Sequence, residues 1–189
     1  PTTLVTVNYI TGSGVIDGTA GNDHITGSDG PDTITAQEGD DVVLAGGGND
    51  IIIAAHGGGS DSYDGGADID TIKFGSATNG IVFQLGGGIL PGTSLRYSTA
   101  DGVDIGHDEF INIEKIVGGQ GDDVFVVHNR LAWEIDGRTG SDIVRIVGAA
   151  NLETEGGPFA YNIEMLDLNT DAAVQVSFAP ADVWIALGL

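Results

Sequence analysis

Aspartate recurs through the first half of this sequence at intervals of nine residues. Starting at Gly18, six consecutive units place aspartate at the sixth position and a bulky apolar or aromatic residue at the eighth, with a two-residue insertion, Ala54 and Ala55, before the fifth unit. Carboxylates repeated at a fixed interval can bind hard cations, and calcium in particular accepts about six to eight oxygen ligands. The sixth-position aspartates are Asp23, Asp32, Asp41, Asp50, Asp61 and Asp70.

The nine-residue unit divides into six turn residues and three strand residues, so two units form one coil with a short strand on each side. Stacked coils give the predicted fold class, which is all-β: a right-handed parallel β-roll with β-rich flanking and capping segments. Glycine at positions one, two and four is expected to adopt positive φ where the chain reverses. Side chains alternate along a strand, so position eight faces the interior. The predicted core residues are Ile16, Ile25, Ile34, Val43, Ile52, Tyr63 and Ile72.

Stacking places the aspartates of alternate units in two columns. Neighbouring strands lie about 4.8 Å apart, and bare carboxylates at that spacing repel each other, whereas a divalent cation between them reverses the sign of the interaction. Calcium suits such a site, because magnesium needs a stricter octahedron and zinc prefers histidine or cysteine ligands. The predicted columns are Asp23, Asp41 and Asp61, and Asp32, Asp50 and Asp70.

Composition excludes several classes of partner. The 189 residues carry 28 acidic and only six basic side chains, for a formal net charge of −22. A nucleic-acid binder or a protein that adheres to anionic membranes needs clustered lysine and arginine, so neither class is expected. The absence of cysteine rules out disulfides and thiolate metal sites. No apolar run reaches the roughly 18 residues that span a bilayer.

Two further stretches repeat the pattern. Residues 9–17 form a degenerate first unit with Gly14 in place of aspartate, which is expected to cap the array. Residues 118–126 and 137–145 carry Asp123 and Asp142 at position six, with a spacing of 19 residues. The chain is therefore predicted to contain an N-terminal cap and main roll at 1–73, a connecting β-rich segment at 74–117, a second, shorter repeat block at 118–147, and a β-rich C-terminal tail or cap at 148–189.

These units resemble the RTX (repeats-in-toxin), or hemolysin-type, calcium-binding repeat family. The resemblance implies that each ion takes carbonyl oxygens at positions two and four and the aspartate at position six from one coil, and carbonyl oxygens at positions one and three and the aspartate from the next. About four or five calcium ions would then bind. The implied sites are Thr19, Gly21, Asp23 with Ala36, Glu38, Asp41; Gln37, Gly39, Asp41 with His56, Gly58, Asp61; Ser28, Gly30, Asp32 with Ala45, Gly47, Asp50; Gly46, Gly48, Asp50 with Gly65, Ala67, Asp70; and Gly119, Gly121, Asp123 with Gly137, Thr139, Asp142.

The resemblance also implies a setting and a role. The chain would be a secreted, extracellular or cell-surface module, exported by a type I system and folded by calcium, that serves as a structural element of a larger adhesin, surface-layer protein or toxin. The alternative is an accessory C-terminal module of a secreted protease, lipase or polysaccharide-modifying enzyme whose catalytic domain lies elsewhere. The expected partners are calcium ions, a larger parent polypeptide and a protein or carbohydrate of unknown identity.

Other motifs do not suggest an activity. The glycine runs near Gly46 and Gly57 lack the Lys-Ser/Thr pair of a phosphate-binding loop, and no EF-hand loop is complete. The cluster His107-Asp108-Glu109 favours a solvated acidic loop over an acid/base site, because no nucleophile accompanies it. We therefore predict no catalytic residues and no organic cofactor.

Positions seven and nine of the third and fourth units are apolar, although they should face outward. The outward faces are expected to be covered by residues 74–117 or by the C-terminal tail, with a partner protein or self-association as the alternative. The side chains concerned are Val42, Leu44, Ile51 and Ile53.

Overall fold

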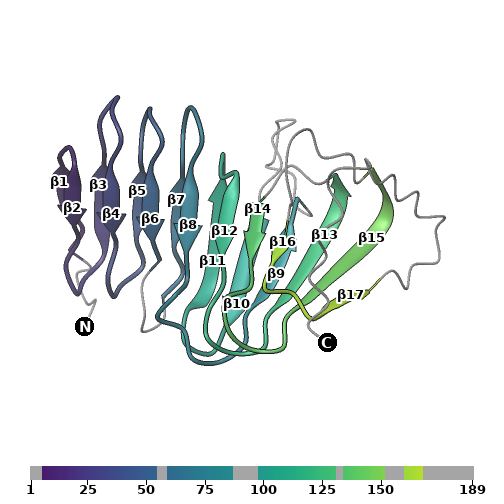
Figure 1. The fold of residues 1–189 in the computed structure, drawn as a ribbon. Helices are drawn as coiled ribbons and strands as arrows, with labels where there is room; N and C mark the ends of the chain where they lie inside the picture. The colour runs from purple at the N-terminus through teal and green to yellow at the C-terminus, as the bar shows by residue number, and fades with distance from the viewer. Residues whose placement is uncertain (1–5, 55–58, 87–97, 131–133, 152–159, 168–189) are drawn as a thin grey trace.

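A computed structural model describes residues 6–54, 59–86, 98–130, 134–151 and 160–167. Within these ranges the chain forms β-strands joined by turns, in one sheet of ten strands and one of seven (Figure 1). None of the described segments is a helix that could cross a membrane. Successive coils of the N-terminal part stand side by side along the roll in Figure 1, which agrees with the predicted all-β parallel β-roll.

The ten-stranded sheet contains strands from both ends of the chain. In spatial order these are β1 (Asn8–Thr11), β3 (Asp23–Thr26), β5 (Val42–Leu44), β7 (Ser62–Asp64), β11 (Gly106–Ile111), β10 (Ser98–Gly102), β9 (Val82–Leu85), β13 (Val124–Arg130), β15 (Ile143–Asn151) and β17 (Met165–Asp167).

The seven-stranded sheet is parallel throughout. In spatial order it contains β16 (Ala160–Tyr161), β14 (Glu134–Asp136), β12 (Lys115–Val117), β8 (Thr71–Lys73), β6 (Ile51–Ile53), β4 (Thr33–Thr35) and β2 (Val15–Asp17). From β2 to β8, each strand pairs with the strand two units further along, so that Ile34 lies opposite Ile52. This register is the one that the nine-residue repeat predicts.

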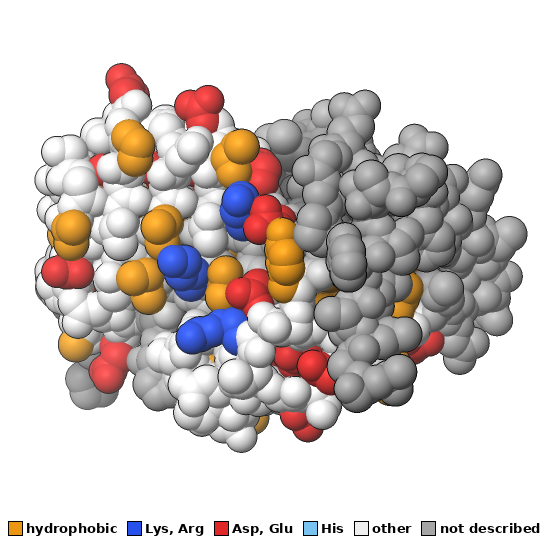
Figure 2. Space-filling view, in the orientation of Figure 1, with side chains coloured by type: hydrophobic (Ala, Val, Ile, Leu, Met, Phe, Trp, Pro, Cys, Tyr) orange, Lys and Arg blue, Asp and Glu red, His pale blue; other side chains and the backbone are white. Residues whose placement is uncertain are grey.

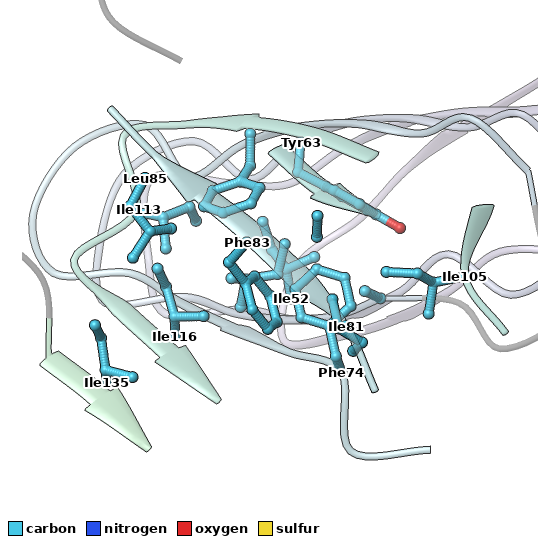
Figure 3. Packing of buried hydrophobic residues seen from close by; sticks show 14 of the residues in the cluster. Ile52, Tyr63, Phe74, Ile81, Phe83, Leu85, Ile105, Ile113, Ile116 and Ile135 are labelled. Atoms are coloured by element: carbon cyan, nitrogen blue, oxygen red, sulfur yellow. The ribbon is translucent and has the colours of Figure 1, made fainter. Parts of the chain in front are cut away.

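The core is a single apolar layer between the two sheets. The seven predicted position-eight residues are all buried, the most exposed being Ile16 at 4%. Towards the middle of the roll the layer also contains aromatic rings, among them Tyr63, Phe74 and Phe83, packed among isoleucines (Figure 3). There the Phe83 ring stacks on Phe125 with 4.6 Å between centroids and meets Phe74 edge-on at 5.3 Å.

The described strands of residues 74–117 enter both sheets: β9, β10 and β11 extend the ten-stranded sheet, and β12 lies in the seven-stranded sheet. β11 pairs in parallel with β7, β9 pairs in parallel with β13, and β10 lies between β9 and β11, antiparallel to both. Phe83, Ala100 and Phe110 point inward from these three strands and are buried. Strands from the described parts of all four predicted segments therefore share the same two sheets.

This arrangement leaves the outward apolar side chains uncovered by the described part of residues 74–117. Val42 is 37% exposed and Leu44 39%, while Ile51 and Ile53 are half-buried. The prediction that this segment covers Val42 and Leu44 is wrong for the residues described, because large apolar side chains of the segment such as Phe83 and Phe110 pack into the core. The end of the predicted C-terminal cover, residues 168–189, lies outside the described residues. On the face in Figure 2, hydrophobic side chains lie singly among polar and charged ones.

Glycine has two different roles in the turns. Gly46 and Gly48, at positions two and four, have φ of 113° and 99°, a region that side chains with a Cβ disfavour. The position-one glycines do not adopt positive φ, and neither do Gly119 at position two or Gly21, Gly30, Gly59 and Gly121 at position four, so the prediction is wrong at those positions. Gly65, at position one, is needed for a close approach instead, because a Cβ there would clash with the carbonyl oxygen of Asn112.

We expect Ile52→Ala to lower the free energy of unfolding by about 2 to 5 kcal/mol, because Ile52 is fully buried and truncation leaves a cavity. Urea unfolding in saturating calcium measures this. Val42→Ala is the matched control on the outward face and should change the free energy of unfolding by less than about 1 kcal/mol. Equal effects of the two substitutions would contradict the assignment of inward and outward positions.

Candidate calcium sites

Backbone-to-carboxylate hydrogen bonds connect the sixth-position aspartates of successive coils. The N–H of Asp23 donates to Oδ1 of Asp41 at 2.8 Å, and the N–H of Asp32 donates to Oδ1 of Asp50 at 2.8 Å. The same bond, also 2.8 Å, repeats into the next coil in both columns. Every one of these carboxylates is at most 4% exposed. The structure thus brings together the columns Asp23, Asp41 and Asp61, and Asp32, Asp50 and Asp70.

The two irregular spacings do not break the contact. Asp41 and Asp61 remain hydrogen-bonded across the insertion, and the N–H of Asp123 donates to Oδ1 of Asp142 at 2.7 Å across the 19-residue coil. In that coil Arg138, at position two, adopts a φ of 68°. The predicted ligands His56 and Gly58 lie outside the described residues.

Three acidic residues extend the columns beyond the prediction. Oδ1 of Asp108 accepts the N–H of Asp61 at 3.2 Å, and Oε2 of Glu114 accepts the N–H of Asp70 at 2.9 Å. Oε2 of Glu164 accepts the N–H of Asp142 at 2.6 Å. Each of these carboxylates therefore takes the place that the next aspartate of a column would occupy.

A repeated tripeptide could have revealed the two glutamates. Asn-Ile-Glu occurs at 112–114 and at 162–164, and in both places it forms the whole turn between two strands. The two asparagines have φ of 53° and 51° and donate from Nδ2 to Asp64 and Asp136. Asp108 had no such signal, because its position depends on how β9, β10 and β11 enter the sheet.

Several of these carboxylates have a second oxygen that is buried without a hydrogen-bond partner. Where position two has negative φ, its N–H satisfies this oxygen, as from Ser28 to Oδ2 of Asp32 at 2.7 Å. Where position two has positive φ, as at Gly46, the N–H does not reach Oδ2 of Asp50. An unpaired buried carboxylate oxygen is costly, and a cation would satisfy it. The buried oxygens without a partner are Oδ2 of Asp41, Asp50, Asp70, Asp108 and Asp142.

Backbone carbonyl oxygens lie beside these carboxylates. The space that a Cβ on Gly27 would fill is bounded by the carbonyl oxygen of Ala45 and by Oδ2 of Asp32, two of the predicted ligands. The position-four backbones also stack, since a Cβ on Gly48 would lie 2.8 Å from the carbonyl carbon of Gly30. Among the described residues, no three His, Asp or Glu side chains converge on one point. Carboxylate pairs with carbonyl oxygens fit calcium and do not fit zinc.

Burial changes the acidity of the columns. It raises the pKa of Asp41, Asp70 and Asp142 to about 6, and the charges of neighbouring carboxylates add to the effect. Burial, followed by the charge of Asp61, raises the pKa of Asp108 to about 8. With raised pKa values, these four carboxyl groups ionise less readily in the calcium-free fold than in water. A bound cation would favour their ionised form.

The repeat itself has a known counterpart. The family model of the RTX calcium-binding nonapeptide repeat matches residues 17–52 in four copies. These residues are RTX repeats. No curated protein matches the chain. The matched RTX repeats include Asp23, Asp32, Asp41 and Asp50, so the first coil-to-coil contact of each column lies inside the matched region.

An RTX repeat is a calcium-binding structural element and is not itself catalytic. The predicted acidic loop around His107 lies on the outward face of the β10–β11 hairpin. There Nδ1 of His107 lies 2.5 Å from Asp101 and Nε2 lies 3.8 Å from Glu109, with the His107 side chain 50% exposed. Asp108, next in sequence, points inward to its column, so the strand separates the two groups.

The calcium-free chain should become less stable as the pH rises. Because burial raises the pKa of Asp70 to about 6 and of Asp108 to about 8, the folded state binds more protons than the unfolded state between roughly pH 4 and 8. The added stability is complete at about pH 4 and is lost by about pH 8. The folded fraction of the chelator-treated chain without denaturant, followed by far-ultraviolet circular dichroism from about pH 4 to about pH 8, measures it, and Asp108→Asn should remove the part of the change above about pH 6. A folded fraction that rises with pH would contradict this assignment.

Asp50→Asn should raise the calcium concentration at half-folding by about tenfold, because a buried oxygen of Asp50 loses its charge while the side chain can still accept the N–H of Asp32. Asp29→Asn is the matched control, since it removes the same charge from an exposed position in a neighbouring turn. Far-ultraviolet circular dichroism during calcium titration measures both. Equal shifts would mean that overall charge, and not the column, determines calcium binding.

Proposed function

We propose that this chain is a calcium-folded structural module of a larger secreted protein. The observation that carries the proposal is the set of buried carboxylate oxygens without partners, most of which belong to columns that begin inside the matched RTX repeats. The chain has a net charge of −22, so repulsion between negative charges opposes stacking both within the columns and over the whole chain. A cation bound between two turns would attract the carboxylates on both sides of it.

The proposed binding sites are the five predicted from the resemblance. Each of them includes at least one aspartate whose Oδ2 is buried without a partner, namely Asp41, Asp50, Asp70 or Asp142. Glu114 and Glu164 extend the same rows at the ends of their columns, which supports their inclusion as additional oxygen ligands. Calcium would supply positive charge at these points, and the columns and turns would supply the oxygen atoms and their spacing.

If folding requires calcium binding, the place where the chain folds depends on the local calcium concentration. Extracellular calcium modules bind their ions at about 10⁻⁴ to 10⁻³ M, concentrations found outside cells and not in the cytosol. A chain with such affinity stays unfolded before export and folds afterwards. This sequence of events suits type I secretion and a parent protein that works at the cell surface or in the medium.

Calcium titration of the chelator-treated chain tests the proposal. We expect a cooperative gain of β-sheet circular dichroism in the low millimolar range at pH 8, reversed by added chelator. Magnesium at the same concentration is the control and should produce little change, because it accepts fewer ligands in a stricter geometry. Calcium at about 10 mM exceeds the dissociation constants expected for these sites, so a spectrum that it leaves unchanged would contradict calcium-driven folding. A spectrum that is already fully β-sheet in chelator at pH 8 would contradict it as well.

A further inference from the structure

A second ladder of hydrogen bonds runs beside the aspartate columns, at position five of the turns. Oδ1 of Asn22 accepts the N–H of Asp40 at 3.1 Å, and Oδ1 of Asp40 accepts the N–H of Ser60 at 3.0 Å. In the other row of turns, Oδ1 of Asn49 accepts the N–H of Ile69 at 3.1 Å. In the C-terminal part, Oδ1 of Asp122 repeats the bond to the N–H of Ser141 at 2.8 Å.

The two ladders point in opposite directions along the roll. In the aspartate columns the side-chain oxygen belongs to the later coil, as when Asp41 accepts the N–H of Asp23. At position five it belongs to the earlier coil, as when Asn22 accepts the N–H of Asp40. Neighbouring turns are therefore joined by bonds from both sides, and a shift of one turn past the next would break both sets.

Position five does not depend on charge for this contact. Asparagine and aspartate occupy it in equivalent bonds, and Asn22, Asn49, Asp40 and Asp122 lie outside the predicted ligand sets. These bonds are solvent-exposed, whereas the column carboxylates are buried. The feature that the four side chains share is one oxygen that accepts a backbone N–H from the next coil.

A similar clamp occurs where the aspartate column is interrupted. Asp104 accepts the N–H groups of Thr78 at 2.6 Å and Asn79 at 2.9 Å, which ties the β10–β11 turn to the connection before β9. At that point Ile81 occupies the place of the column aspartate and donates its N–H to Asp123. Turn-to-turn bonds of this type thus form beside a position that offers no carboxylate pair for a cation.

We propose that the position-five side chains Asn22, Asp40, Asn49 and Asp122 are positioning residues for calcium. They hold adjacent turns at the separation at which column carboxylates and backbone carbonyls converge. The turns are then already ordered when an ion binds, so binding carries a smaller entropy cost. This inference rests on the proposed function. It assigns to these residues an effect on calcium affinity without direct contact with the ion.

Asp40 offers the sharpest test, because it bonds to the coil before it and to the coil after it. Asp40→Ala removes the acceptor, whereas Asp40→Asn keeps an oxygen at the same place and removes only the charge. In about 1 M NaCl, where exposed charges are screened, Asp40→Ala should raise the calcium midpoint about threefold to tenfold and Asp40→Asn less than about twofold. Amide exchange of Ser60 in saturating calcium should accelerate in Asp40→Ala and not in Asp40→Asn.

Asn49→Ala provides a second test in which no charge changes. If Asp40→Ala fails to fold, this variant tests whether position-five side chains affect calcium affinity. It should also raise the midpoint, and Asn49→Asp should restore it to within about twofold of the original value. Equal midpoints for the alanine variants and the original chain would overturn the inference, as would equal shifts for Asp40→Ala and Asp40→Asn. If the circular dichroism of the original chain does not change with calcium, the proposed function itself is wrong.

Discussion

Stacking the turns of this roll brings buried carboxylates of successive coils together. Their negative charges repel one another, and the rest of the structure depends on how this repulsion is balanced. Each coil contributes one small apolar layer and two short strands, so its hydrophobic gain is modest. The hydrogen bond from the N–H of Asp32 to Asp50 satisfies one carboxylate oxygen and leaves the other without a partner. In the proposed calcium sites, a cation would satisfy that second oxygen.

The turn backbone decides which carboxylates are left open. Thr19, Ser28 and Gly119 donate their N–H groups to the aspartate of the same turn, and these are the first turns of their rows. Gln37 and Gly46, further along, have positive φ and leave the aspartate oxygen open. The opening member of each row is thus satisfied by its own turn, whereas Asp41, Asp50, Asp70 and Asp142 each keep a buried oxygen without a hydrogen-bond partner.

Hydrophobic burial contributes most at the middle of the roll. The insertion of β9, β10 and β11 adds Phe83 and Phe110 to a core that elsewhere consists mainly of isoleucine. Burial of aromatic side chains is favourable without any cation. The Asp104 contacts to the N–H groups of Thr78 and Asn79 join the β10–β11 turn to the connection before β9.

The sequence by itself determined the repeating parts of this protein. A nine-residue period specifies strand length, the inward position of Ile25 or Ile52, the parallel pairing of alternate units and the alignment of aspartates, because each of these depends only on residues in neighbouring coils. Tertiary structure alone decided how residues 74–117 enter the sheet, since β9 skips two strand positions that β10 and β11 later fill. That choice depends on the fit of distant apolar side chains in one core, and it places Asp108 in a column that no local pattern could predict.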